Sequence, residues 1–313
     1  MKSIGKISLG PIVGLACGAL LLMGAEQATA QNEIIVSQYV HNQYAINPAF
    51  AGSREGLSLY GGFRKQWTAI ENTPRSFLFT GHTPLRNEKM TLGANLYVQG
   101  IHETTSAGLM VSVGYRTQIK RDVYLGFALQ PGVAIRTADW SKVRLMDEQD
   151  NVFTDKESGA APLLGFGASI YAPKYFAGLS VQTLFLSDSF ERTKAEFAPA
   201  DATYLLTGGY WFDVNDRWAI QPSLMLDYNK ANDMATDITA SVIYNEKLWV
   251  DLAYRTTKDM TIGVAYMPKR QLKIAYSYTL SMGDLRSYDA GSHEISIQYD
   301  FVYRVKTVGH RFY

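Results

Sequence analysis

Apolar and polar residues alternate with a period of two along most of the chain beyond residue 56. In the segment 123–135, Leu125, Phe127 and Leu129 belong to an apolar series, and small or polar residues such as Gln130 lie between them. Successive side chains of a β-strand point to opposite faces, so this alternation indicates strands with one apolar and one polar face. No stretch keeps the 3.6-residue period of a helix. The pattern therefore predicts an all-β fold.

About fourteen segments show this alternation, and most are near the ~10 residues that a tilted membrane strand needs. They lie at 57–67, 75–83, 89–101, 107–119, 123–136, 161–172, 175–186, 203–213, 217–228, 234–245, 248–256, 259–267, 270–281 and 292–303.

The connections between these segments tend to alternate in length. Short ones such as 120–122 and 173–174 are separated by longer polar ones at 137–160, 187–202 and 281–291, and 257–258 is short where a long loop is due. Outer-membrane barrels have short periplasmic turns at one rim and longer loops at the other, whereas a soluble sandwich gives no reason for this parity. The sequence therefore predicts a transmembrane outer-membrane β-barrel of about 14 antiparallel strands over 57–303, with both chain ends periplasmic.

The composition supports a wall between lipid and a narrow lumen. Charged residues are only 19% of the chain and concentrate in the connections. Pro131 and Pro222 fall inside predicted strands, where proline cannot donate to the ladder, and we interpret them as bulges. Aromatic residues near strand ends predict the girdles that such barrels carry at the membrane interfaces. They are Trp67, Trp140, Trp211, Trp218, Tyr228, Tyr254 and Tyr266.

The two ends of the chain are expected to lie outside the barrel wall. Lys2 and Lys6 precede an apolar run and the small-residue site at 28–30, which predicts a signal peptide over 1–30 that is removed. An uncleaved anchor, or lipidation at Cys17, is the alternative at this end. The last ten residues, 304–313, are predicted to form a short periplasmic tail.

The segment 31–56 follows the predicted cleavage site and has neither strand nor helix period. It contains the sequence QYAINPAFAG at 43–52. Asn47 precedes Pro48, which favours an extended backbone at Asn47. Irregular backbone at membrane depth is tolerated only where it is buried in protein or lines a wet cavity. We therefore expect 31–56 to form a plug inside the barrel or a lip at its periplasmic mouth.

Candidate chemistry is scarce. The five histidines have no metal-ligand spacing, and the acidic stretch 147–157 lacks the central glycine of a calcium loop. We expect no cofactor, no metal and no catalytic residues. The net charge of +1 gives no indication of nucleic-acid binding.

Two N-terminal motifs resemble the PorP/SprF family. The first is Tyr-x-x-Asn-Pro-Ala-aromatic-Ala-Gly, and the second is Arg-x-Gln-Trp followed by a proline. The matching residues are Tyr44, Asn47, Pro48, Ala49, Phe50, Ala51, Gly52, Arg64, Gln66, Trp67 and Pro74.

The resemblance implies a non-enzymatic outer-membrane component of the type IX secretion machinery or its gliding counterpart. The expected partners are a periplasmic secretion-ring lipoprotein and its partner, a peptidoglycan-binding lipoprotein, and outer-membrane lipid. A passive porin or small-solute channel is the alternative from the residues alone.

Closure of the barrel makes its first and last strands neighbours. On the predicted parity, Arg64 of the first strand and Glu294 of the last strand both face the lumen. Burial of an isolated charge is costly, so we predict that these two residues form a pair at the seam. The alternative is a hydrated arginine in a wet lumen.

Overall fold

The structure is a computed structural model. It describes residues 37–54, 56–70, 72–139, 156–182, 185–186, 196–197, 202–230, 233–283, 286 and 289–301. The predicted signal peptide 1–30, the first six residues of the predicted plug and the predicted tail 304–313 lie outside the described residues. None of the helices in the described part is long and apolar enough to cross a membrane.

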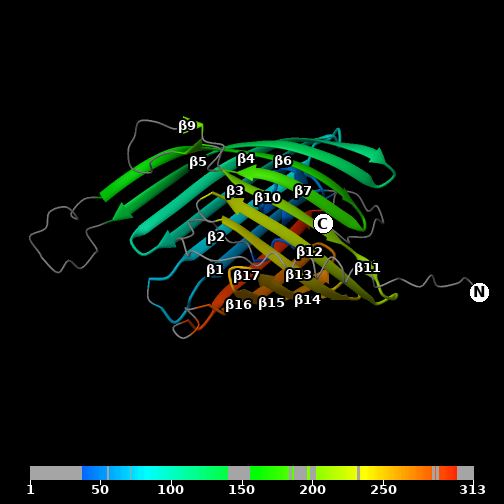
Figure 1. Cartoon of the computed structure of the whole chain (residues 1–313). Helices are drawn as coiled ribbons and strands as arrows, with labels where there is room; N and C mark the ends of the chain where they lie inside the picture. Colours follow the sequence, from blue (N-terminus) through cyan, green and yellow to red (C-terminus); the bar gives the residue numbers. More distant parts are fainter. Residues whose placement is uncertain are drawn as a thin grey trace, which may run out of the picture. The chain divides into compact units, whose positions relative to one another are not determined.

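Fourteen antiparallel strands form a closed barrel, which confirms the fold predicted from the alternation (Figure 1). The strands are β1 (Leu57–Lys65), β2 (Arg75–Pro84), β3 (Met90–Ile101), β4 (Thr104–Lys120), β5 (Val123–Asp139), β6 (Lys156–Ala172), β7 (Tyr175–Gln182), β10 (Thr203–Tyr210), β12 (Trp218–Asn229), β13 (Asp233–Tyr244), β14 (Leu248–Arg255), β15 (Asp259–Lys269), β16 (Leu272–Ser281) and β17 (Ser292–Phe301). Three two-residue strands complete the described set: β8 (Phe185–Leu186) pairs only with β9 (Glu196–Phe197), and β11 (Phe212–Asp213) extends the edge of β12 next to β10. Pairing of β1 with β17 closes the wall, so that no edge is left open to lipid.

Several strand ends differ from the prediction. β1 stops at Lys65, because Trp67 has a positive φ of 46° that turns the chain out of the strand. β4, β5 and β6 each extend to 17 residues, and the added length lies at the rim of the long loops. That rim also has short connections at 102–103 and 256–258, so the alternation of loop lengths is less regular than predicted. The opposite rim has only short connections, the longest being 211–217, which contains β11.

The two strand prolines do not mark bulges, and that prediction is wrong. Pro131 faces Leu164 and Pro222 faces Ala240 with the register of each ladder unbroken. Proline removes one N–H without requiring an extra residue, and the ladder between β10 and β12 is interrupted beside Pro222 before β11 resumes it in the same register. Register shifts occur instead at Gln118–Lys120 and Tyr266–Lys269, both next to short turns.

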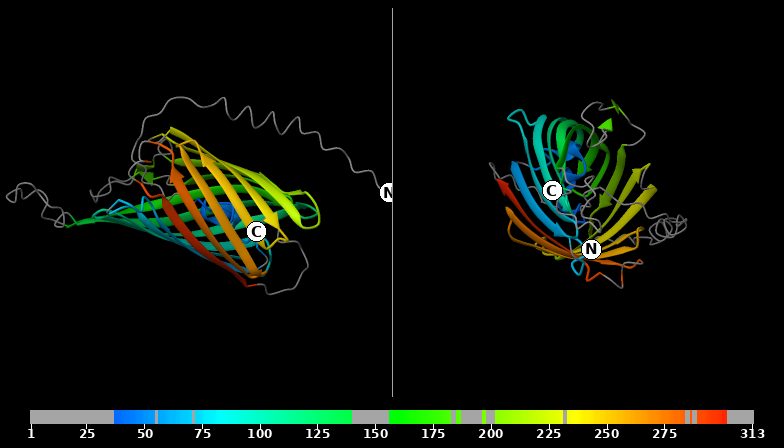
Figure 2. Two further views of the ribbon diagram at one scale, coloured as in Figure 1. Left: turned by 90° about the horizontal axis from the view of Figure 1, so that it is seen from below. Right: turned by 90° about the vertical axis from the view of Figure 1, so that its left-hand side faces the viewer.

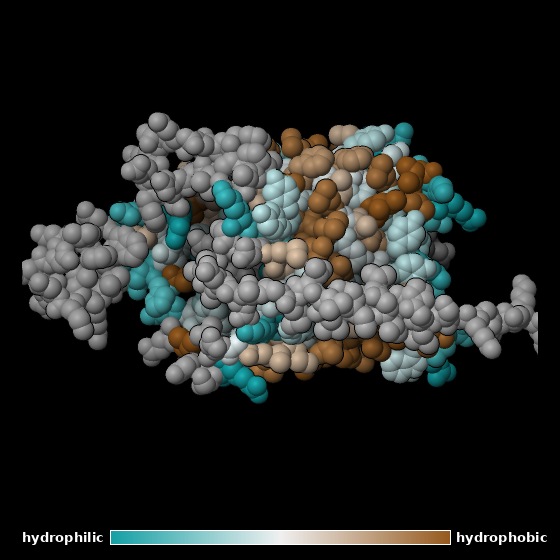
Figure 3. Space-filling model, viewed as in Figure 1, coloured by the Kyte–Doolittle hydropathy of each residue, from teal (hydrophilic) through white to brown (hydrophobic). Residues whose placement is uncertain are grey.

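The two faces of the wall are chemically distinct. Apolar side chains such as Leu129, Val133 and Ile295 are about half exposed on the outer face, whereas neighbours such as Gln130 are buried. Figure 3 shows the apolar residues as a broad band across the strands, with hydrophilic residues gathered toward the rims. This is the surface that a bilayer requires.

The predicted aromatic girdle is confirmed only in part. Trp218, Tyr228 and Tyr266 lie on the outer face with 45%, 48% and 51% exposure. Trp211 instead points inward, is 1% exposed and packs against the buried Trp249. Alternation along β10 accounts for this orientation, because Trp211 shares its parity with the buried Thr207, whereas Tyr210 is 43% exposed. Position near a strand end therefore does not by itself predict an outward face.

We expect Leu129→Arg to destabilise the inserted barrel by about 2–4 kcal/mol, because Leu129 faces lipid near the middle of β5, where an arginine is costly. Ile119→Arg is the matched control. Ile119 is equally exposed, at 49%, but lies at the end of β4, where the cost should fall to about 0–1 kcal/mol. Reversible unfolding in liposomes measures both. Equal losses of unfolding free energy in the two variants would mean that Leu129 does not lie deeper in the membrane than Ile119.

Candidate functional site

Residues 37–54, which we call the lumen segment, occupy the interior of the barrel. Figure 2 shows them in blue inside the ring of strands. The segment contains two single turns of 3-10 helix, η1 (Gln43–Ala45) and η2 (Pro48–Phe50). Tyr39, Tyr44 and Phe50 are at most 2% exposed. At these residues the irregular segment is buried in protein, as the bilayer requires.

Asn47 is the residue that fixes the second turn. Its backbone is extended (φ −147°, ψ 111°), and its side-chain Oδ1 accepts a hydrogen bond of 2.9 Å from the N–H of Ala49. Pro48 follows as the first residue of η2, where a missing N–H costs nothing. The Asn-Pro pair of the sequence therefore acts as a helix start.

The same side chain also joins the lumen segment to the wall. Asn47 Nδ2 donates to the carbonyl oxygens of Ala168 on β6 and Leu179 on β7, at 3.1 and 3.2 Å. Two glycines of the wall leave space for the Asn47 side chain. A Cβ on Gly167 would lie 2.2 Å from Asn47 Oδ1, and one on Gly178 would lie 2.6 Å from Nδ2.

Tyr44 contacts a neighbouring part of the wall, at β4 and β2. Its hydroxyl lies 2.7 Å from Ser112 Oγ on β4, and a Cβ on Gly93 would lie 2.2 Å from that hydroxyl. The ring packs 4.8 Å from the ring of His82 on β2.

The small residues of the motif allow close approach to the wall. Phe50 packs against Tyr171 and Phe176, with ring centroids 6.0 Å apart in both cases. The carbonyl of Ala49 accepts a hydrogen bond from Ser169 Oγ at 3.0 Å, and a Cβ on Gly126 would lie 2.7 Å from this carbonyl oxygen. Ala51 is buried in the same cluster.

Gly52 ends the motif where only glycine fits. Its φ is +67°, and a Cβ there would lie 2.6 Å from Thr91 Cγ2. Its N–H donates to His82 Nδ1 at 3.0 Å, and its carbonyl accepts from Arg116. The glycine therefore turns the chain from the lumen toward the start of β1.

Polar side chains of the lumen segment contact the remaining walls. Gln38 Nε2 donates to Ser277 Oγ on β16 at 3.1 Å, and Gln38 Oε1 accepts from Ser296 on β17. His41 Nε2 lies 2.8 Å from Asp251 Oδ2 on β14, and Asn42 donates to Thr80 on β2 at 3.1 Å. The segment is thereby bonded to strands on every side of the lumen.

The second motif lies at the other rim. Arg64 is opposite Glu294 in the β1–β17 register, and Arg64 Nη1 is 3.2 Å from Glu294 Oε2, with both side chains buried. Gln66 and Trp67 follow the end of β1, where the N–H of Gln66 donates to the carbonyl of Pro74 and that of Trp67 donates to Ser292 Oγ. The structure therefore brings Arg64 and Glu294 together but separates the two N-terminal motifs.

Sequence reasoning missed several other lumen ion pairs. Arg54 pairs with Asp300, and Arg255 lies 2.9 Å from both Asp227 and Asp237. Alternation does place Asp227, Asp251 and Asp300 on the inner face, but it does not show which cation reaches each of them, whether from another strand, as Arg255 does, or from the lumen segment, as Arg54 does. Among the described residues, no group of three or more potential ligands is arranged to hold a metal ion.

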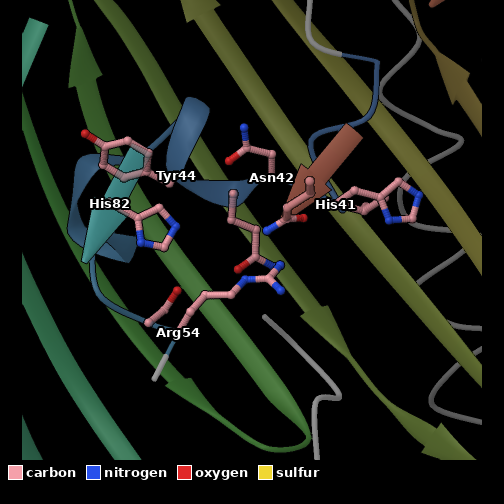
Figure 4. A pocket seen from close by; sticks show the side chains of 9 residues that line it. His41, Asn42, Tyr44, Arg54 and His82 are labelled. Atoms are coloured by element: carbon pink, nitrogen blue, oxygen red, sulfur yellow. The ribbon is translucent and has the colours of Figure 1, made fainter. Parts of the chain in front are cut away.

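Two small cavities border the lumen segment. One has a volume of ≈ 10 Å³ and lies between Tyr44 and His82 on one side and His41 on the other, beside Arg54 (Figure 4). The second, also ≈ 10 Å³, lies between Gln38 and the wall. A cavity of this volume has room for about one water molecule. Neither of these two cavities provides a path for a solute.

Comparison with known proteins adds a family. A family model described as "Type IX secretion system membrane protein PorP/SprF" matches residues 28–299. Among solved structures, the outer membrane protein Omp33 of Acinetobacter baumannii superposes with a TM-score of 0.45 at 8% identity, over 80% of this chain and 100% of that one. The CymD monoaromatic hydrocarbon channel superposes with a TM-score of 0.44 at 11% identity, over 88% and 95%. No curated protein sequence matches the chain significantly.

We expect Asn47→Ala to lower the unfolding free energy by about 1–3 kcal/mol, because it leaves buried backbone groups without partners. Asn47→Asp keeps an acceptor for the N–H of Ala49 but removes the donor that faces two carbonyl oxygens. It should therefore lower the unfolding free energy more than Asn47→Ala does. Urea unfolding in liposomes gives both values. If Asn47→Asp is as stable as the unsubstituted protein, the hydrogen bond from Ala49 N–H to Asn47 Oδ1 stabilises the fold and the hydrogen bonds from Asn47 Nδ2 to the wall do not.

We expect Arg64→Leu to cost roughly 3–5 kcal/mol, because Glu294 is left buried without its partner. The double variant Arg64→Leu with Glu294→Leu should be more stable than Arg64→Leu alone. A double-mutant cycle in liposomes measures this coupling. Additive costs would show that the pair does not hold the seam.

Proposed function

The chain belongs to the PorP/SprF family of type IX secretion system membrane proteins, and from this premise we propose that it is a plugged, non-enzymatic outer-membrane anchor of that machinery. It would link the outer membrane to a periplasmic secretion-ring lipoprotein with its partner, and to a peptidoglycan-binding lipoprotein. The observation that carries the proposal is the filled lumen. A passive porin needs an open path, whereas here polar and aromatic side chains bond the lumen segment to the surrounding walls.

The proposal places the rim of short turns, and both chain ends, in the periplasm. Supporting this orientation, outer-membrane barrels keep their short turns on the periplasmic side. β1 begins and β17 ends at this rim. Arg54, the last described residue of the lumen segment, pairs there with Asp300. A partner that binds this rim would contact both the short turns and the end of the lumen segment near Arg54.

The short-turn rim also carries charge that suits a protein partner. Each of its six connections contains an exposed lysine or arginine in or beside the turn. Representative cations are Arg86, Arg121, Lys174, Arg217, Lys247 and Arg270. Several acidic residues lie among them, so the rim presents charges of both signs for specific pairing rather than a uniform field.

Deletion of residues 40–52 tests the proposal. We expect the shortened barrel still to insert, because closure depends on the β1–β17 ladder, but to conduct ions in planar bilayers and to lose type IX secretion in cells. The full chain should conduct little and should co-purify with periplasmic lipoproteins. Substitution of exposed residues in the 85–89 turn at the proposed docking rim, such as Arg86→Ala with Lys89→Ala, should weaken that co-purification without opening a channel.

Other outcomes separate the alternatives. Steady conductance of the full chain would favour a porin. Loss of co-purification after the deletion, with no gain in conductance, would make the lumen segment a docking element. Failure of the shortened chain to insert would make it part of the wall.

A further inference from the structure

Basic side chains form a row on the outer face of the barrel at the rim of the long loops. In the β1–β2 ladder Lys65 is directly opposite Arg75, and in the β1–β17 ladder Lys65 is directly opposite His293. Residues directly opposite in antiparallel strands point to the same face. Two residues further into each strand, Phe63, Phe77 and Ile295 are 45%, 41% and 54% exposed to the membrane. The row therefore lies at the edge of the apolar band and faces outward.

These cations lack the partners that lumen cations have. Arg54, Arg64 and Arg255 each pair with a carboxylate inside the barrel. Within the described part of the chain, no side-chain hydrogen bond or ion pair joins Lys65 or Arg75 to another residue. Like charges directly opposite on one face of a sheet repel each other, so the arrangement costs stability unless an anion lies between them.

The surroundings of the row favour a particular anion. The hydroxyl of Tyr276 is 2.7 Å from Nδ1 of His293, which fixes that ring beside the two cations. Asp289 interacts electrostatically with His293 but, within the described part of the chain, forms no ion pair with Lys65 or Arg75. The site is thus a hydrogen-bonding and positively charged edge directly above exposed aromatic rings.

We propose that Lys65 and Arg75, with His293, bind the phosphate of a membrane-lipid headgroup whose acyl chains lie along Phe63 and Phe77. Phosphate suits this row, because it accepts several charge-assisted hydrogen bonds, and arginine binds it through two parallel ones. The row opens toward the lipid face rather than into a pocket, so the anion arrives attached to a lipid. Clusters of lysine and arginine at membrane edges recognise anionic headgroups in the same way.

Native mass spectrometry of the full chain in detergent tests this with two probes, bis-phosphorylated lipid A and the same lipid after removal of its phosphates. The phosphorylated form should bind and the dephosphorylated form should not. Lys65→Gln with Arg75→Gln should weaken binding about thirtyfold, since each cation near a headgroup contributes about a fivefold change in affinity. Lys120→Gln with Arg121→Gln removes two exposed cations at the opposite rim and should leave binding unchanged.

The proposal fails if both double variants lose affinity equally, since binding would then reflect net charge, or if dephosphorylated lipid binds as well as the phosphorylated form. Displacement of the lipid by excess inorganic phosphate alone would show a site for a free anion. Heat-dependent gel migration verifies that each variant is folded. If the double variant does not fold, Lys65→Gln and Arg75→Gln are measured singly, and each should retain part of the affinity.

Discussion

The requirement that every buried polar group find a partner governs both surfaces of this barrel. On the outside, hydrocarbon accepts no unpaired backbone group, which is why the wall closes through the β1–β17 ladder. On the inside, the lumen segment brings an irregular backbone to membrane depth and must satisfy it locally. The hydroxyls of Ser169 and Ser180 do so by donating to the carbonyls of Ala49 and Ile46. The inner face of the strands thus supplies hydrogen-bond partners to the irregular backbone that it surrounds.

This match explains the small residues of the inner face. Serine supplies a hydroxyl with little bulk, and glycine supplies space where a side chain of the segment enters the wall. Gly167 and Gly178 admit Asn47, and Gly93 admits Tyr44. A lumen that carried water and solutes would not need wall positions shaped to individual side chains of an N-terminal segment. The fit between these glycines and the side chains of the lumen segment therefore indicates a filled barrel, whatever the volume of the remaining cavities.

The sequence predicted the strands, their number and their faces, because period-two alternation is a local property that membrane burial enforces at every position. It also predicted that Asn47 would be extended, since the steric effect of Pro48 acts on its immediate neighbour. It failed where the outcome depends on contacts between distant segments. His41 meets Asp251 across 210 residues of sequence, and nothing near either residue indicates the other. Trp211 is a different case: its nearness to a strand end predicted an outward girdle position, whereas its parity, shared with the buried Thr207, directs it inward.

The contacts of the last strand couple closure to filling. β17 carries Glu294, which faces Arg64 across the seam, and its backbone carbonyl accepts a hydrogen bond from Gln38 at 3.3 Å. The same strand holds Asp300, the partner of Arg54 at the exit of the lumen segment. β17 is the last strand of the described chain, so the start and the end of the lumen segment each need this final strand for a partner. Without β17 in place, Arg54 and Arg64 would lack their carboxylates, and Gln38 Oε1 would lack its donor Ser296, although Gln38 Nε2 would keep Ser277 of β16. Closure removes these costs in one step. Occupation of the lumen therefore favours the closed wall, and the closed wall favours occupation of the lumen.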